Sequence, residues 1–420
     1  MTKNIGFLSF RLAGTDGVSL ETAKWAQVLE RLGHNCFFCA GELDTPEERS
    51  HLVPRAQFKH PDIQEFYPEL FNQEQRPRRI TTRIHELRES LKKDIYEFLE
   101  RFAIDVLVPQ NTLTIPLNIP LGLAITEVIA ESGIPTIAHH HDFYWERQRF
   151  LTNCVWDYLR AAFPPRLSDI RHVVINSSGR NQLALRSGAN SYLIPNVMDF
   201  ANPPPDLDEY NSDLRSALGL SAEDIFILQP TRVVQRKGIE HAIELVKRLE
   251  DDRAVLVISH ASGDEGFEYE ARVRSYADLL GIRALFVDQI IDQVRGTTSD
   301  GRKVYGLEDV YPHADLVTYP SLFEGFGNAF LEAVWHRKPV FVNNYSVYAY
   351  DIRPRGFQAA EMTDFITDQT LVETRRFIED EAFREEAVAR NYDVGRRFFS
   401  FEVLESDLEH ILMEIFGVSD

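Results

Sequence analysis

Two glutamates on either side of a glycine-rich turn are the residues in this chain best suited to chemistry. Glu324 and Glu332 are separated by seven residues, which begin with Gly325, Phe326 and Gly327. The apolar run before the turn is typical of a buried strand, and the run after it is typical of a helix. The turn therefore falls at the carboxyl end of a strand, where open α/β sheets bind ligands and where a helix N-terminus offers N–H groups to hydroxyl or phosphate oxygens. Such a junction favours the binding of an activated sugar.

The same pair of carboxylates has a second interpretation. A glycoside hydrolase also uses two carboxyl groups, an acid and a nucleophile or base, on either side of one bond. A hydrolase or phosphorylase with Glu324 and Glu332 as its catalytic pair would act without any nucleotide. The two glutamates by themselves do not distinguish this alternative from the binding of an activated sugar.

Two cations follow a second apolar run that has the character of a buried strand. Arg232 and Lys237 lie between that run, residues 225–229, and an amphipathic helical pattern that begins at Ile239. Two cations beside a helix N-terminus can neutralise a diphosphate leaving group directly, so such a site needs no metal. Arg236 lies between the two and is interpreted as a surface residue.

A glycine pair near the amino terminus provides a third candidate site. Gly14 and Gly17 lie between a strand-like run at residues 5–10 and a helical pattern that ends at Gly33. Backbone N–H groups in such a turn can cradle a phosphate. The loop lacks the Gly-x-Gly-x-x-Gly spacing of a dinucleotide fingerprint, which disfavours a nicotinamide-dependent reductase.

Three adjacent histidines end a further strand-like run at residues 134–138. Because side chains alternate along a strand, we expect His139 and His141 on one face and His140 on the other. This alternation disfavours a metal site, and no Glu-x-x-His or paired cysteines accompany the histidines in the sequence. We therefore predict no bound metal.

Polar residues directly after the histidines are candidates for binding an acceptor that carries charge or many hydroxyl groups. They are Asp142, Glu146, Arg147 and Arg149, and His140 is a further candidate on this side.

Taken together, these four elements resemble the retaining glycosyltransferases of family 4, which have the GT-B fold. The resemblance rests on Glu-Gly-Phe-Gly followed by Glu-Ala, on Arg-x-x-x-x-Lys-Gly, on the glycine-rich first loop and on His-Asp, in the family's order over residues 5–335. It implies that Glu324 contacts the donor sugar, that Glu332 contacts the ribose, and that His141 lies close to the transferred sugar, with His140 as the alternative. The implied catalytic residues are His141, Glu324, Arg232 and Lys237. The implied donor-binding residues are Gly14, Gly17, Arg232, Lys237, Glu324, Gly325, Phe326, Gly327 and Glu332.

The fold implied is α/β, with two Rossmann-like, doubly wound parallel-sheet domains that face one another across a cleft. Apolar runs of strand length alternate with helical patterns on both sides of a proline-rich linker at residues 195–205. We predict an amino-terminal, acceptor-side domain over residues 1–200 and a nucleotide-sugar domain over residues 201–400. The last helix, about residues 400–420, is expected to cross back onto the first domain. The linker departs from the family's Pro-Asn-Gly-Val-Asp, because Asn196 and Val197 are directly joined.

Composition narrows the class of protein further. The chain has 420 residues and a formal net charge of -20, which disfavours nucleic acid and anionic membranes as partners. Its apolar runs are of strand length, so we expect no stable membrane insertion and a cytoplasmic location. Three cysteines indicate a reducing compartment, and Cys36 and Cys39 are interpreted as core residues. A homo-oligomer remains open.

The resemblance implies transfer of a hexose, mannose or glucose, from GDP-mannose or UDP-glucose to a hydroxyl of a small soluble acceptor, with retention and without an obligatory cofactor. The first loop, the histidine run and the tyrosine-rich residues 338–354 also resemble synthases of mannosylglucosylglycerate-type compatible solutes. For such an acceptor, Arg147 or Arg149 would hold a carboxylate or phosphate. Two alternatives remain: the hydrolase or phosphorylase, and a nucleotide-sugar-binding protein that has lost catalysis.

Overall fold

A computed structural model describes residues 1–14, 16–262, 267–292 and 294–417. The chain divides into two compact units. One comprises Met1–Val197 together with Phe401–Asp420, and the other comprises Met198–Ser400. Each unit is described by itself.

The first unit is built on a seven-stranded parallel sheet with the order β3-β2-β1-β4-β5-β6-β7. Strands β2 and β3 lie on one side of β1 and β4 lies on its other side, so the strand order reverses between β1 and β4. That switch point is where ligands bind in doubly wound sheets. The strands are β1 (Asn4–Ser9), β2 (Asn35–Ala40), β3 (Ser50–Leu52), β4 (Val106–Pro109), β5 (Thr136–His140), β6 (Ile170–Val174) and β7 (Ser191–Leu193).

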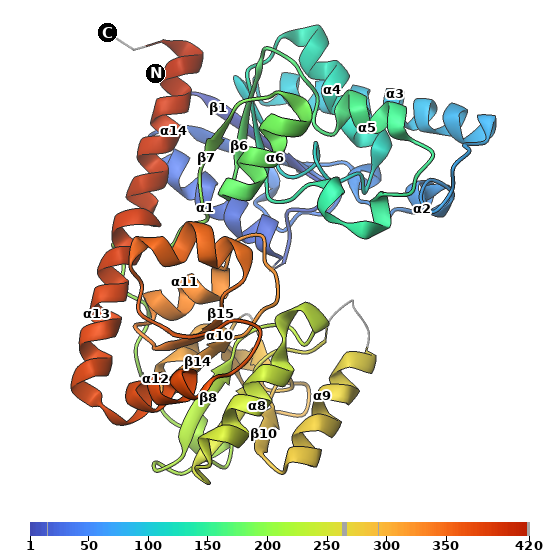
Figure 1. Cartoon of the computed structure of the whole chain (residues 1–420). Helices are drawn as coiled ribbons and strands as arrows, with labels where there is room; N and C mark the ends of the chain where they lie inside the picture. The colour runs from blue at the N-terminus through green and yellow to red at the C-terminus, as the bar shows by residue number, and fades with distance from the viewer. Residues whose placement is uncertain (15, 263–266, 293, 418–420) are drawn as a thin grey trace. The chain divides into compact units, whose positions relative to one another are not determined.

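Helices cover both faces of this sheet. Successive strand residues point to opposite faces, so Phe7 joins the core under α1 and α14 whereas Leu8 joins the core under α3 and α4. Helices α3 and α4 lie side by side, and α14 lies along α1 (Figure 1). The helices are α1 (Gly17–Arg31), α2 (Pro61–Gln64), α3 (Arg78–Arg101), α4 (Ile119–Ser132), α5 (Trp156–Ala162), α6 (Ser177–Ser187) and α14 (Phe401–Phe416).

The second unit has a six-stranded parallel sheet with the order β10-β9-β8-β14-β15-β16. Its order reverses between β8 and β14, which are hydrogen-bonded neighbours. The strands are β8 (Ile225–Gln229), β9 (Ala254–Ile258), β10 (Arg283–Phe286), β14 (Leu316–Tyr319), β15 (Val340–Asn343) and β16 (Ala360–Met362).

A small three-stranded sheet lies between β10 and β14 in the sequence and was not predicted. Its strands are β11 (Ile291–Asp292), β12 (Gly296–Thr297) and β13 (Lys303–Gly306), in the order β11-β13-β12. Strands this short carry too few residues for a period-two pattern to be recognised.

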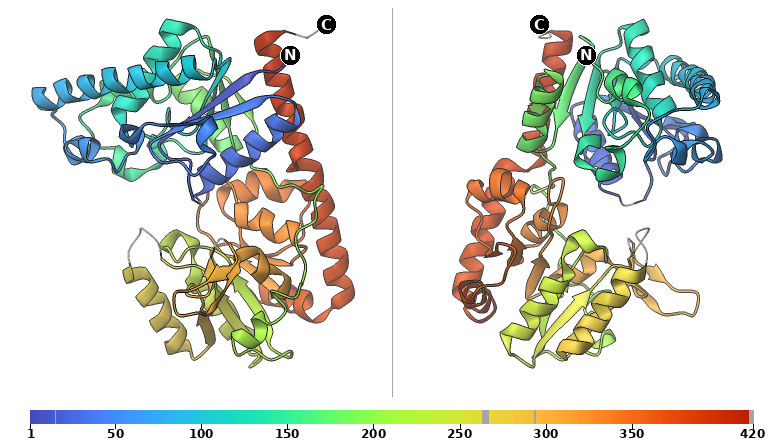
Figure 2. Two further views of the ribbon diagram at one scale, coloured as in Figure 1. Left: turned by 180° about the vertical axis from the view of Figure 1, so that it is seen from behind. Right: turned by 45° about the vertical axis from the view of Figure 1, so that its right-hand side comes forward.

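Helices α8, α11 and α12 contact strands of the six-stranded sheet, α13 packs on α11 and α12, and α8 and α9 lie side by side (Figure 2). The helices of this unit are α7 (Leu214–Ala217), α8 (Ile239–Leu249), α9 (Phe267–Leu280), α10 (Leu307–Val310), α11 (Asn328–Trp335), α12 (Asp368–Glu379) and α13 (Glu381–Phe398), with a π-helical turn at Tyr348–Ile352.

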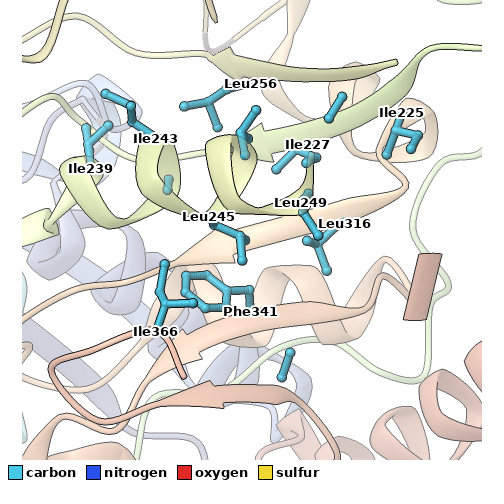
Figure 3. Packing of buried hydrophobic residues seen from close by; sticks show 14 of the residues in the cluster. Ile225, Ile227, Ile239, Ile243, Leu245, Leu249, Leu256, Leu316, Phe341 and Ile366 are labelled. Atoms are coloured by element: carbon cyan, nitrogen blue, oxygen red, sulfur yellow. The ribbon is translucent and has the colours of Figure 1, made fainter. Parts of the chain in front are cut away.

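The apolar stripe predicted for α8 is buried as expected. Ile239, Ile243 and Leu249 point toward strand residues that include Ile227 and Leu256 (Figure 3). The prediction of two Rossmann-like parallel-sheet domains is therefore confirmed at the level of each unit.

Two further observations concern composition. Within the described ranges, no helix combines the length and apolar character that a membrane span requires. Cys36 and Cys39 are buried and unpaired, as predicted for core residues, and burial raises the pKa of both thiols.

Replacing Phe341 tests this core. Phe341, on β15, is 0% exposed in the hydrophobic core of the second unit, so Phe341→Ala should destabilise this unit by about 3–5 kcal/mol through lost burial and a cavity. The measurement is the guanidinium midpoint, with Leu279→Ala as control because Leu279 is 78% exposed. An unchanged midpoint for Phe341→Ala would contradict the burial of Phe341 in this hydrophobic core.

Candidate functional site

Two loops meet at the switch point of the second unit. They follow β8 and β14, whose parallel pairing puts both carboxyl ends at one edge. The N–H of Leu322 donates to the carbonyl of Arg236 at 2.8 Å. A Cβ at Gly238, where φ is +60°, would lie 2.5 Å from the carbonyl oxygen of Pro320. Only glycine suits this position, because the two backbones approach too closely for a side chain.

The carboxylate of Glu324 lies between two cations from the neighbouring loop. The Nζ of Lys237 is 2.5 Å from Oε1, and Nη1 of Arg236 is 2.6 Å from Oε2. The side chain of Glu324 is only 9% exposed. Burial alone would raise the pKa of Glu324, but the charges of Lys237 and Arg236 outweigh it and hold the pKa below its ordinary value. Glu324 is therefore an ionised, buried carboxylate whose charge is balanced by neighbouring cations.

The interpretation of Arg236 as a surface residue was wrong. Its side chain is 25% exposed and is ion-paired to Glu324. The sequence carried one signal, which is that Arg236 stands directly beside Lys237 just before a helix. Its partner on a distant loop follows only from the pairing of β8 with β14.

The other predicted cation, Arg232, is exposed at the same edge, near a histidine that sequence reasoning missed. His260 follows β9, the neighbour of β8. Burial lowers the pKa of His260 to about 4, and the charges of Arg232 and Lys237 lower it in the same direction. His260 is therefore neutral near pH 7, beside a cationic edge. Its position just after a buried strand was the available signal.

The glycine turn, residues 325–327, and Glu332 follow Glu324 in the chain. Gly327 has a φ of +155°, and a Cβ there would lie 2.4 Å from the hydroxyl of Tyr345, which donates to the carbonyl of buried Phe326 at 2.7 Å. Gly325 is exposed. Glu332, on α11, accepts a hydrogen bond from Tyr311 at 3.0 Å. The two glutamates thus have different environments: one is paired with cations and the other with a tyrosine.

In the first unit, the predicted glycine loop joins β1 to α1. The N–H of Gly14 donates to Asp44 at 2.8 Å, and Asp16 caps α1 by accepting from the N–H groups of Val18 and Ser19. Gly17, the first residue of α1, is exposed, as is Gly14. Thr15 lies outside the described residues. A phosphate here would have to share the helix N-terminus with the carboxylate of Asp16.

The three histidines alternate as predicted. The rings of His139 and His141 lie 4.4 Å apart, and both reach Oε1 of Gln110, at 2.9 and 3.4 Å. His140 instead pairs with His172 at 2.8 Å. His139 and His140 are buried whereas His141 is half-buried, so His141 is the accessible one of the two alternatives.

Burial sets the charge of this group. It lowers the pKa of His141 to about 4, although Asp142 and Asp16 oppose the effect, and it lowers the pKa of His139 and His140 well below the ordinary value. Among the described residues, no group of three or more side chains is arranged to hold a metal ion.

The acceptor-side candidates lie just beyond β5. Asp142 accepts from Asn111 at 2.7 Å and is ion-paired to Arg147. The guanidinium of Arg149 lies over the ring of Phe150, 4.7 Å from its centroid. Both arginines are exposed, and both act on Tyr67, whose pKa is raised by burial to about 12 even though their charges lower it. The result is a pair of exposed arginines beside a neutral tyrosine.

Doubly wound parallel sheets with charged loops at their switch points define the class of α/β proteins that bind ligands at the carboxyl ends of their strands. Comparison with known proteins gives the family. Residues 211–388 match the family described as Glycosyl transferases group 1. The chain belongs to this family.

Two relatives are named mannosylglucosylglycerate synthases. One, from Petrotoga mobilis, is 32% identical over 85% of this chain and 86% of its own. The other, from Thermotoga maritima, is 31% identical over 96% of this chain and 98% of its own.

Solved structures confirm the GT-B fold. A glycosyltransferase from Rickettsia africae superposes with a TM-score of 0.68 at 14% identity, over 100% of both chains. Anabaena HepE, in complex with UDP and glucose, superposes with a TM-score of 0.63 at 13% identity, over 98% of this chain and 99% of its own.

The buried histidines predict how stability depends on pH. Burial lowers the pKa of His172 to about 4, below the value of about 6.5 in an unfolded chain. The stability that depends on a neutral His172 is therefore fully present above the pKa of the unfolded chain, and it is lost as pH falls from there through the pKa of the folded protein. His172→Asn keeps a polar partner for His140 but does not titrate, so its melting temperature should fall less than that of the wild type between pH 7 and about pH 5.

The matched control is His410→Asn, because the side chain of His410 is 66% exposed on α14. It should keep the pH dependence of the wild type. Equal losses in His172→Asn and the wild type would contradict the assignment of His172 as a buried neutral group.

Proposed function

We propose that this chain is a retaining hexosyltransferase that moves mannose or glucose from a nucleoside diphosphate sugar to a hydroxyl of a small acceptor of the glucosylglycerate type. The observation that carries the proposal is the buried carboxylate of Glu324, held by Lys237 and Arg236 where β8 and β14 end. The names of the Petrotoga and Thermotoga relatives support the acceptor class, and the UDP and glucose bound to HepE support a nucleotide-sugar donor.

The donor's diphosphate would bind Arg232 and Lys237. Negative charge grows on the leaving phosphate only as the glycosidic bond lengthens, so cations placed there stabilise the transition state more than the ground state. These two cations would neutralise the leaving diphosphate, which is the role of a metal ion in other transferases. With no general base apparent near the acceptor, the leaving phosphate itself would accept the proton of the acceptor hydroxyl.

The sugar and the nucleoside would be held by the turn after β14. Glu324 would accept hydrogen bonds from sugar hydroxyls, with the N–H groups of residues 325–327 beside it. Glu332, already oriented by the hydroxyl of Tyr311, would accept from the ribose hydroxyls. In the first unit, Gly14 and Gly17 would contact the diphosphate, and neutral His141 would support the sugar.

The acceptor would bind near the two exposed arginines that follow β5. Arg147 and Arg149 are exposed and could pair with the carboxylate of a glycerate group or with a phosphate. His140 is buried against His172, so Asp142 and the two arginines are the better candidates. The domain boundary at residue 200, a cytoplasmic location and a homo-oligomer remain predictions.

The hydrolase or phosphorylase alternative is disfavoured. Glu324 does not suit the role of the general acid, which needs a raised pKa, because two cations lower its pKa. Its use as the nucleophile is opposed by the ion pairs that hold both of its oxygens. Family membership points to transfer as well.

Replacing Lys237 tests the diphosphate site. Lys237→Ala removes a cation from the leaving group, so kcat should fall by about 100- to 1,000-fold, as for loss of one donor to a developing oxyanion. The assay is hexosyl transfer from GDP-mannose and UDP-glucose without added metal, and thermal shift with GDP and UDP measures binding. Lys247→Ala, an exposed lysine on α8, is the control. Turnover like that of the wild type would reject the site.

Replacing Arg149 tests the acceptor side. Arg149→Gln should raise the KM for glucosylglycerate about tenfold, through loss of one charge-assisted hydrogen bond, and leave the KM for the donor unchanged. Glucosylglycerol, which lacks the carboxylate, should show no difference between the variant and the wild type. Arg101→Gln, an exposed arginine on α3, is the control. Absence of any hexosyl product with glucosylglycerate or its phosphorylated form would contradict the acceptor class.

A further inference from the structure

The two oxygens of Glu324 have different partners. Oε1 contacts Lys237 at 2.5 Å and Oε2 contacts Arg236 at 2.6 Å. The two cations are consecutive in the chain and occupy the 3-10 turn Gln235–Lys237. One carboxylate therefore compensates two positive charges through two separable contacts.

The proposed reaction gives Lys237 and Oε1 a second partner each. The ammonium group of Lys237 has three N–H donors and Oε1 has two lone pairs, so a diphosphate bound to Lys237 and a sugar hydroxyl bound to Oε1 both compete with the contact between them. If Lys237 alone balanced Glu324, its departure would leave a carboxylate that is only 9% exposed without a counter-ion, which is strongly unfavourable.

Arg236 removes this conflict. Its planar guanidinium suits a lasting contact with a carboxylate, while the more flexible ammonium of lysine suits exchange between partners. The backbone of Arg236 is fixed, because its carbonyl accepts from Leu322 and because Gly238 packs against Pro320. Its side chain reaches Glu324 from a rigid base.

We infer that Arg236 is a positioning residue for the transfer reaction: it remains on Oε2 of Glu324 as the permanent counter-ion, so that Lys237 can leave Oε1 for the donor's diphosphate and Oε1 can accept a sugar hydroxyl. This inference rests on the proposed function for the identity of the ligand. The counter-ion role itself concerns only this chain's residues.

The charged and titratable groups around Glu324 are few. Lys237 and Arg236 face it from the turn before α8, Tyr319 from the end of β14, and Tyr345 from the segment after β15. Burial raises the pKa of both tyrosines well above the ordinary value, so both stay neutral. The two cations are thus the main groups that keep Glu324 ionised, and a hydrogen bond from Ser321 acts in the same direction.

The test is the pH profile of kcat/KM for the donor in the wild type, Arg236→Gln and Arg236→Lys. Losing one charged hydrogen bond should lower kcat/KM by about 10- to 100-fold in Arg236→Gln. Removing a cation also raises the pKa of Glu324, so the acidic limb of the profile should move to higher pH. Arg236→Lys should restore the limb and part of the rate. An acidic limb like that of the wild type in Arg236→Gln would overturn the inference.

Arg253→Gln is the matched control. Arg253 is a 54% exposed arginine of the same unit that pairs with Asp251, and its loss should leave both rate and profile unchanged.

A substrate-free measurement separates this inference from the proposed function. At pH 7, Arg236→Gln should be less stable than the wild type. The difference should shrink as pH falls through the pKa of Glu324 in the variant, because the carboxyl group of the variant then takes up a proton and no longer needs a counter-ion, while that of the wild type is still ionised. In a Glu324→Gln background, Arg236→Gln should add no pH-dependent change. A pH-independent difference would overturn the counter-ion role even in active protein, whereas failure of the wild type to transfer from any nucleotide sugar would reject the proposed function alone.

Discussion

The charge balance of one buried carboxylate organises the second unit's candidate site. Glu324 is ionised although almost enclosed, and it stays so because Lys237 and Arg236 occupy its two oxygens. That arrangement depends on the parallel pairing of β8 with β14 and on the absence of a side chain at Gly238. The sheet, the glycine and the ion pairs together hold the two loops in contact.

The first unit uses the same topology with different electrostatics. Its strand order also reverses beside β1, and polar residues from the ends of β4 and β5 meet at Gln110 and Asn111. Burial keeps the histidines neutral there, and the loop carboxylates are already occupied by arginine or by backbone N–H groups. The neutral histidines and the amides there suit hydroxyl-rich ligands, and exposed Arg147 and Arg149 suit an anionic group of the acceptor. The cationic edge of the second unit suits a diphosphate.

This division of charge bears on the type of reaction. Hydrolysis by a carboxyl pair needs one group that keeps its proton, and the surroundings of Glu324 exclude it from that role. The same surroundings suit a residue that accepts hydrogen bonds from sugar hydroxyls while the cations beside it bind a leaving phosphate. The family match over residues 211–388 and the two synthase relatives agree with transfer.

The sequence by itself determined the class of fold and the local signals of the site. Apolar runs predicted the main strands, the α8 stripe and the alternation of the histidines, because periodicity is a local property of the chain. Only the tertiary structure decided the partners: Arg236 on Glu324, His140 on His172, and His260 beside Lys237. The small sheet β11-β13-β12 was missed because two-residue strands leave no pattern. Contacts between residues some 90 positions apart, such as Arg236 and Glu324, depend on which strands become neighbours, and spacing along the chain does not encode that choice.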